Sequence, residues 1–199
     1  MPTKTLKIGV TGGIGSGKSL VCSIFQTFGI PVYNADSRAK YLMTENQNVI
    51  KSIRKIFGDK AYLDSGALNT EYLANFVFQN EDQLKILNGI VHPSVAIDFE
   101  QWFELQKLSP YVIKEAALLV ESGSYTSLDH LITVIAPPEL RIGRVLKRDP
   151  HRTRKDIANI ISNQLDDQIK VSKSEFVVNN DGDTLLIPQV LKIHHSLIS

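Results

Sequence analysis

A stretch near the N-terminus has the residue types and the spacing that bind the phosphates of a nucleotide. Residues 12–19 read GGIGSGKS and fit the pattern G-x-x-x-x-G-K-[ST] at every fixed position. Glycines let the backbone approach an anion closely, so that successive N–H groups can point inward at it. In this pattern Lys18 reaches the β- and γ-phosphate oxygens, and the hydroxyl of Ser19 binds Mg²⁺. The residues expected to contact the nucleotide here are Gly13, Ile14, Gly15, Ser16, Gly17, Lys18, Ser19 and Leu20.

The segments on either side of this stretch are those that the motif requires. Leu6, Ile8 and Val10 form an apolar strand pattern before it, and apolar residues at helical spacing follow it over 20–28. The positive end of the predicted helix adds to the attraction for an anion. This strand, loop and helix favour a nucleotide-phosphate loop over a glycine-rich turn with a chance lysine.

Two acidic residues lie where other predicted strands end. Asp36 follows the strand pattern at 30–33, and Glu115 ends the one at 111–115. Ligands of open α/β sheets bind at the carboxyl ends of the strands, so both carboxylates are candidates for chemistry. Glu115 would hold magnesium through water. The alternatives are that Asp36 caps the next helix and that Glu115 is a surface acid at a strand end.

One strongly basic segment occurs late in the chain. Arg141, Arg144 and Arg148 are spaced to share a face of a predicted helix, and more basic residues follow over 151–155. Such a segment is typical of a lid that closes over phosphates. A nucleic-acid surface is the alternative, which the lack of interleaved aromatic residues disfavours.

The composition indicates one α/β domain with no general attraction to nucleic acid or membranes. The chain has 199 residues, a net charge of +1 and 22% charged residues. The single cysteine, Cys22, cannot form an internal disulfide and is expected to be a small core residue. No apolar run approaches 18 residues, so we expect neither a signal peptide nor a membrane span, and a cytoplasmic location.

Further strands are predicted at 130–136 and 176–178, and helices over most of 36–108, one of which Pro93 is expected to break or restart. One helix is predicted over 155–170 and another at the C-terminus. The core of the single domain is therefore expected at 1–60 and 109–199. A helical insertion at about 61–108 would be either a subdomain for a second substrate or a structural cover for the sheet.

Several motifs together resemble the dephospho-CoA kinase family. The loop alone is shared by many nucleotide-hydrolysing proteins, but the combination in this order is far more selective. The matching stretches are GVTGGIGSGKS at 9–19, VYNADSRAK at 32–40, LNGIVHPSV at 87–95, ALLVESG at 117–123, PPELRIGRVLKRD at 137–149 and SEFVVNNDG at 174–182.

The resemblance implies a P-loop kinase fold, with a five-stranded parallel sheet flanked by helices, a helical substrate subdomain and a basic lid at about 141–157. It implies transfer of the γ-phosphate of ATP, with Mg²⁺, to the ribose 3′-hydroxyl of dephospho-CoA, the last step of coenzyme A biosynthesis. The partners implied are these small molecules alone, in a monomer or weak homo-oligomer.

The resemblance also assigns roles to individual residues. Asp36 matches the acid that orients or deprotonates the attacking hydroxyl, and Lys18 and Arg144 are assigned to catalysis. Arg148 matches a second lid residue that contacts phosphates, and Asn180 falls in a loop close to the adenine. The sequence departs from the family pattern at two acids: Asn34 replaces the first acid of D-A-D, and Glu115 replaces an aspartate.

Two rival functions share the phosphate-binding loop. One is a P-loop kinase for another small acceptor, such as a nucleoside monophosphate. The other is a nucleotide-dependent switch, against which the sequence has neither N-K-x-D nor D-x-x-G. A panel of acceptors separates these functions, since a switch hydrolyses its nucleotide slowly without any acceptor.

Overall fold

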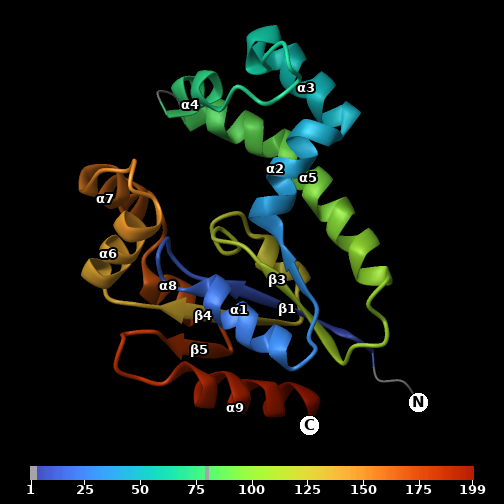
Figure 1. The fold of residues 1–199 in the computed structure, drawn as a ribbon. Coiled ribbons are helices and arrows are strands. Elements are labelled where there is room, and N and C mark those ends of the chain that lie inside the picture. The colour runs from blue at the N-terminus through green and yellow to red at the C-terminus, as the bar shows by residue number, and fades with distance from the viewer. Residues whose placement is uncertain (1–3, 79–80) are drawn as a thin grey trace. The chain divides into compact units, whose positions relative to one another are not determined.

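The computed structural model of the chain describes residues 4–78 and 81–199. The chain forms two compact units, of which the second is the helical segment Ala35–Leu105. The first unit contains a five-stranded sheet with helices on both of its faces (Figure 1).

All strands of the sheet are parallel, and β1 lies at its centre. Its strands are nearly continuous runs of apolar residues, as expected for a sheet covered on both faces. The predicted five-stranded parallel sheet and each of its strands are therefore confirmed. In spatial order they are β2 (Val32–Asn34), β3 (Tyr111–Glu115), β1 (Leu6–Thr11), β4 (His130–Ile135) and β5 (Phe176–Asn179).

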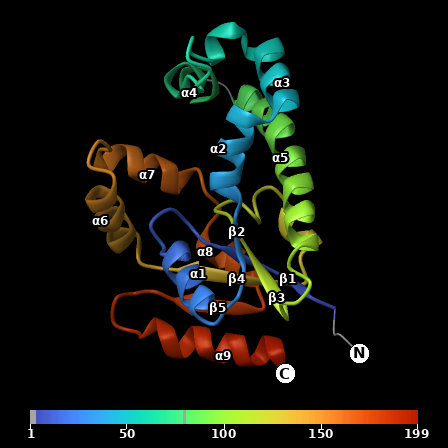
Figure 2. The ribbon, with the colours of Figure 1, turned by 45° about the vertical axis from the view of Figure 1, so that its right-hand side comes forward.

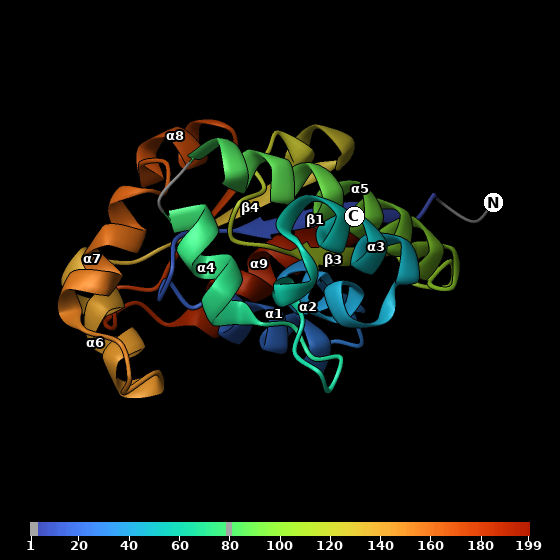
Figure 3. The same ribbon diagram turned by 90° about the horizontal axis from the view of Figure 1, so that it is seen from above.

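Among its described residues, the first unit also contains six helical segments. Seen from above, α1 and α8 lie on opposite sides of β1 and β4 (Figure 3). Helices α1 and α9 share an apolar core with the sheet that includes Phe25, Tyr111 and Val190. Helices α6 and α7 pack on each other (Figure 2) around a small cluster of their own. The segments are α1 (Lys18–Thr27), η2 (Ser124–Ser127), α6 (Pro138–Arg148), α7 (Arg154–Ser162), α8 (Asp167–Ser172) and α9 (Leu186–Ile198).

The second unit is entirely helical apart from one isolated bridge, Tyr62 to Leu68, among its described residues. It begins at Ala35, whereas the sequence places the start of the insertion near residue 61. Helices α2 and α3 pack against α5, and so they belong to this unit. Its helical segments are α2 (Ala35–Glu45), α3 (Gln47–Phe57), η1 (Asp59–Ala61), α4 (Thr70–Phe78) and α5 (Glu81–Glu104).

Helix α5 continues through Pro93, so the break predicted there is wrong. A proline removes one hydrogen bond from a helix and crowds the carbonyl four residues earlier. In α5 that earlier residue is Gly89, and Val91, Val95 and Phe99 are buried along the helix. Apolar burial on both sides of the proline therefore outweighs its local cost.

The single helix predicted over 155–170 is also wrong, because the chain forms two helices there. Helix α7 ends at Ser162, and Asp166 caps the start of α8 by accepting a hydrogen bond from the N–H of Gln168 at 2.7 Å. The connection between them, residues 163–166, is a turn within the predicted apolar pattern. No helix of the described residues is long and apolar enough to cross a membrane.

Candidate active site

The phosphate-binding motif forms the loop between β1 and α1. Gly17 is the N-cap of α1 and has a φ of 97°, in the left-handed region that favours glycine. A Cβ on Gly17 would lie 2.1 Å from Nδ2 of Asn180, so this position also requires glycine for close approach. Helix α1 thus begins at Lys18 with its positive end at the loop.

Several backbone N–H groups of this loop have no acceptor within residues 4–78 and 81–199. Two other N–H groups already have acceptors. The N–H of Ser16 donates to the carbonyl of Gly13 at 3.2 Å, and that of Ile14 donates to Oε1 of Gln164 at 2.9 Å. A run of unused N–H groups at a helix start is an anion-binding feature. The unused groups belong to Gly15, Gly17, Ser19 and Leu20.

Lys18 extends back over the loop that precedes it. Its Nζ donates to the carbonyl oxygens of Gly12 at 3.0 Å and Gly13 at 3.3 Å. The ammonium group is therefore held at the loop, where it is placed to meet an anion bound by the N–H groups.

Ser19, Glu115 and Asn34 form a polar cluster at the carboxyl ends of the strands. The hydroxyl of Ser19 donates to Oε1 of Glu115 at 2.7 Å, and Nδ2 of Asn34 donates to Oε2 at 2.8 Å. Asn34 and Glu115 are direct partners in the register of β2 and β3. Glu115 is only 5% exposed, so it is a buried member of this cluster and not a surface acid.

Cys22 lies near this cluster in α1 and is buried, as the sequence predicts. Burial, and after it the negative charge of Glu115, raise the pKa of the Cys22 thiol well above its ordinary range. The thiol is therefore neutral and is not a nucleophile.

Arg144 and Asn180 come together beside the loop. Nη2 of Arg144 donates to Oδ1 of Asn180 at 3.0 Å, and Nδ2 of Asn180 donates to the carbonyl of Ser16 at 2.7 Å. Nη1 of Arg144 is buried and has no hydrogen-bond partner in the described part of the chain. A buried guanidinium nitrogen without a partner, beside unused loop N–H groups, fits a site for an anionic ligand.

The three arginines of α6 differ in their surroundings, although their spacing suggests one shared face. Arg148 has a side chain 63% exposed and pairs with the adjacent Asp149 at 2.9 Å. Arg141 is 4% exposed and contacts the loop backbone, so it does not belong to an exposed cationic surface. Of the three, only Arg144 has a buried nitrogen without a partner.

Asp36 belongs to the second unit and lies in the first turn of α2. It is exposed, and its carboxylate makes no hydrogen bond or ion pair with any residue in 4–78 or 81–199. It does not cap the helix through a side-chain bond. In the same unit, Arg38 forms a two-point ion pair with Asp98 of α5, at 2.8 and 2.5 Å.

A model of the dephospho-CoA kinase family matches residues 6–185 of the chain. The chain belongs to the dephospho-CoA kinase family. The dephospho-CoA kinase of Salinibacter ruber is 40% identical over 177 residues, which cover 88% of each chain. That of Bacteroides fragilis is 36% identical over 188 residues, covering 94% of this chain and 91% of the relative.

Solved structures agree with this assignment to the dephospho-CoA kinase family. A Thermus thermophilus protein superposes with a TM-score of 0.85 at 29% identity, covering 99% of this chain and all of that one. Dephospho-CoA kinase from Campylobacter jejuni gives a TM-score of 0.69 at 26% identity, covering 96% of each chain. Shikimate kinase from Acinetobacter baumannii, at 12% identity and a TM-score of 0.51, shares the fold alone.

The family expectation from the sequence is thus confirmed, together with the P-loop kinase fold. As a dephospho-CoA kinase by family, the chain is a phosphotransferase that uses ATP and an alcohol acceptor, and it acts on small molecules. Sequence reasoning did not find the amide of Asn34 as a partner of Glu115, nor the contacts that Arg141 and Gln164 make with the loop. The available signal for Gln164 was the stretch SNQLDD at 162–167, which is polar except for Leu165.

Proposed function

We propose that this chain transfers the γ-phosphoryl group of ATP to the ribose 3′-hydroxyl of dephospho-CoA, giving CoA and ADP. Family membership across residues 6–185 carries the proposal for the acceptor. The unused N–H groups of the loop and the unpartnered nitrogen of Arg144 support the nucleotide as donor. In the transfer, the bond between the γ-phosphorus and the β–γ bridging oxygen breaks as the bond to the 3′-oxygen forms.

The loop is proposed to hold the phosphates of ATP. The transition state of phosphoryl transfer carries charge on its equatorial oxygens, so fixed N–H groups and cations stabilise it. Lys18 and Arg144 supply positive charge beside the loop, and Asn180 orients Arg144. The proposed contacts are those of Gly13, Ile14, Gly15, Ser16, Gly17, Lys18, Ser19, Leu20, Arg148 and Asn180, with residues 141–157 as a lid.

Mg²⁺ fits the Ser19 site in its chemistry. The hydroxyl donates its hydrogen to Glu115, which leaves the oxygen lone pairs of Ser19 available to a hard cation. No three His, Cys, Asp or Glu side chains of the described residues are grouped to hold a metal, so Mg²⁺ would be shared with the nucleotide phosphates. When bound, Mg²⁺ neutralises charge on those phosphates.

Asp36 is proposed to accept the proton of the attacking 3′-hydroxyl late in the transfer and to orient that hydroxyl. Its support is its place two residues after β2, its exposure, and a carboxylate with no partner within residues 4–78 and 81–199.

The helical insertion, predicted at about 61–108, is proposed to bind the acceptor. We further propose a cytoplasmic monomer or weak homo-oligomer that does not bind nucleic acid.

The test is ADP formation by the purified chain with ATP, Mg²⁺ and a panel of acceptors. We expect rapid ADP release with dephospho-CoA and only background release with AMP, shikimate or no acceptor. Faster release with another member of the panel would replace the acceptor, and acceptor-independent hydrolysis would favour a nucleotide switch.

A further inference from the structure

One residue of the phosphate-binding loop is held on both sides by side chains from distant parts of the chain. The N–H of Ile14 donates to Oε1 of Gln164 at 2.9 Å, and the carbonyl of Ile14 accepts from Nε of Arg141 at 2.9 Å. Two hydrogen bonds to one residue fix the orientation of both peptide planes that flank it. The loop is therefore held in its shape by the protein itself.

Arg141 approaches the loop so closely that it leaves no room for a side chain at one position. A Cβ on Gly13 would lie 1.9 Å from Nη2 of Arg141. The guanidinium of Arg141 is in turn oriented by Asp167 of α8, which it meets at 3.1 Å. The charge of Arg141 is thus neutralised within the protein, so the side chain acts on the loop backbone by its geometry.

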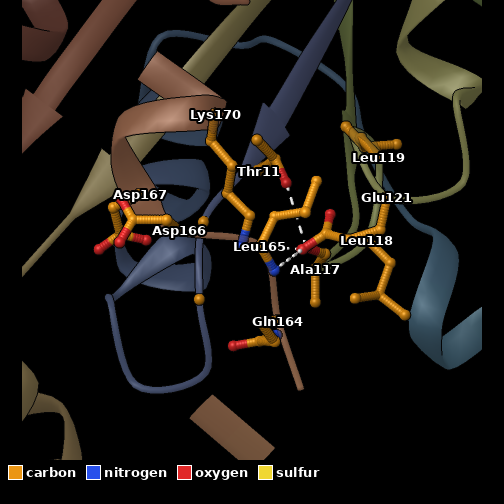
Figure 4. Close-up of polar contacts among 12 residues, drawn as sticks. Thr11, Ala117, Leu118, Leu119, Glu121, Gln164, Leu165, Asp166, Asp167 and Lys170 are labelled. Atoms are coloured by element: carbon orange, nitrogen blue, oxygen red, sulfur yellow. Dashed lines mark hydrogen bonds and ion pairs between the residues drawn. The ribbon is translucent and has the colours of Figure 1, made fainter. Parts of the chain in front are cut away.

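Gln164 lies on the short connection between α7 and α8, which a buried ion pair holds in place. Figure 4 shows the carboxylate of Glu121 facing both the side chain of Lys170 and the backbone of Leu165. Oε1 of Glu121 meets Nζ of Lys170 at 2.9 Å and accepts from the N–H of Leu165 at 3.2 Å. Lys170 is fully buried, so its positive charge must be compensated inside the protein, and the carboxylate of Glu121 compensates it.

These contacts form one continuous set that ends at Ile14. Glu121 and Lys170 fix the backbone next to Gln164, Gln164 holds the N–H of Ile14, and Arg141 holds its carbonyl. Nη2 of Arg141 also donates to Oε1 of Gln164 at 3.4 Å, so the two side chains that hold Ile14 contact each other. None of these side chains lies in the G-x-x-x-x-G-K-[ST] motif.

We propose that Gln164 and Arg141 are positioning residues for nucleotide binding, and that the Glu121–Lys170 pair maintains them. By fixing Ile14, they keep the unused N–H groups of Gly15 and Gly17 in the arrangement that receives phosphate, before any ligand arrives. Preorganisation of this kind raises affinity, because the free energy of binding is not spent on ordering the loop. The inference rests on the proposed function of the loop as an ATP site.

The test compares Gln164→Ala with Gln168→Ala, the same substitution at an exposed glutamine of the same segment. Hydrogen exchange of the Ile14 amide in the ligand-free protein is measured by NMR, and the dissociation constant for Mg-ATP by calorimetry. In Gln164→Ala we expect about tenfold faster exchange at Ile14 and about tenfold weaker ATP binding, since an ordinary hydrogen bond contributes about that factor. Gln168→Ala should leave both unchanged.

Arg141→Lys provides an independent variant, because it keeps a charge beside Asp167 but lacks the guanidinium that reaches the Ile14 carbonyl. It should also weaken ATP binding, while the KM for dephospho-CoA stays within twofold in both variants. Unchanged exchange at Ile14 in Gln164→Ala, or faster exchange with undiminished ATP affinity, would overturn the proposal. Failure of the proposed function would instead appear in the unsubstituted protein, as absent ATP binding or absent transfer.

Discussion

At the scale of single residues, Glu115 connects the loop to the end of the sheet. Its carboxylate accepts from the hydroxyl of Ser19 and from the amide of Asn34, and these two bonds hold it in one orientation. An amide at position 34, in place of a second carboxylate, donates a hydrogen bond and avoids repulsion between two acids. Asn34 and Glu115 therefore act as a matched pair.

Replacing Glu115 by Gln should raise the Mg²⁺ concentration needed for half-maximal activity by about tenfold. The substitution keeps the shape but removes the charge that accepts from Ser19, and hydrogen bonds to charged groups are stronger than neutral ones. The measurement is a magnesium titration of the rate at saturating ATP and acceptor. Glu71→Gln, at an exposed acid of α4, is the control. An unchanged titration in Glu115→Gln would remove Glu115 from the metal site.

Replacing Asp36 by Asn should lower kcat by about 10²–10⁴-fold, the usual contribution of a general base. ATP binding should survive, because the substitution leaves the phosphate-binding loop intact. Lys18→Ala provides the contrast, since it should impair both ATP binding and turnover. Near-normal kcat in Asp36→Asn would exclude Asp36 from the chemistry.

Single residues also show which contacts a sequence pattern can report and which it cannot. The roles proposed for residues 12–19 rest on a local pattern, because the motif lies in one turn of backbone. Arg141 looks like a member of a cationic face by its spacing, yet it is buried against the loop. Its partners are Ile14 and Asp167, 127 and 26 residues away, and no local pattern reports such contacts.

At the scale of elements, apolar periodicity predicted the five strands but misjudged two helices. The strands are short apolar runs with clear ends, so their apolar pattern and their length both indicate buried strands. The apolar residues of α7 and α8 keep the spacing of one continuous helix, but the chain turns between them. Asp166 then caps the start of α8, so two helices form in place of one. In α5 the opposite occurs, since burial carries the helix past Pro93. Tertiary packing outweighs a local signal in α5, while a local cap interrupts the apolar period between α7 and α8.

Helix α9 is attached to the sheet by a contact that should respond to pH. The hydroxyl of Tyr111 and Nδ1 of His194 are 2.7 Å apart. Burial, and then the nearby His195, lower the pKa of His194 below its usual value of about 6.5. Well above pH 6.5 the imidazole is neutral in both folded and unfolded states, so its contribution to stability is complete there. Below pH 6.5 the unfolded chain takes up the proton first, and stability is lost.

The melting temperature should therefore fall between pH 7 and pH 5, and part of that fall should be absent in His194→Gln. His151→Gln is the matched control, because His151 is exposed and makes no side-chain hydrogen bond within the described residues. Differential scanning calorimetry at the two pH values measures the change. An equal fall in the wild type and in His194→Gln would contradict this role of His194.

At the scale of the whole molecule, the chain combines a sheet unit, which carries the G-x-x-x-x-G-K-[ST] loop, with a helical unit. The donor site stays a prediction, made from residues that form one loop and the ends of adjacent strands. The boundary of the helical unit at Ala35 could not be predicted from sequence, because α2 and α3 have ordinary helix patterns and only their packing on α5 assigns them. The acceptor follows from family membership, since no single motif encodes the recognition of a ribose hydroxyl.

The central claim is that the ribose 3′-hydroxyl of dephospho-CoA receives the γ-phosphoryl group of ATP. The most direct measurement is phosphorus NMR and mass spectrometry of the product after incubation with ATP and Mg²⁺, using dephospho-CoA and its 2′-deoxy and 3′-deoxy analogues. We predict a new 3′-phosphomonoester from dephospho-CoA and from the 2′-deoxy analogue, and none from the 3′-deoxy analogue. Phosphorylation of the 3′-deoxy analogue, or of none of the three compounds, would contradict the account.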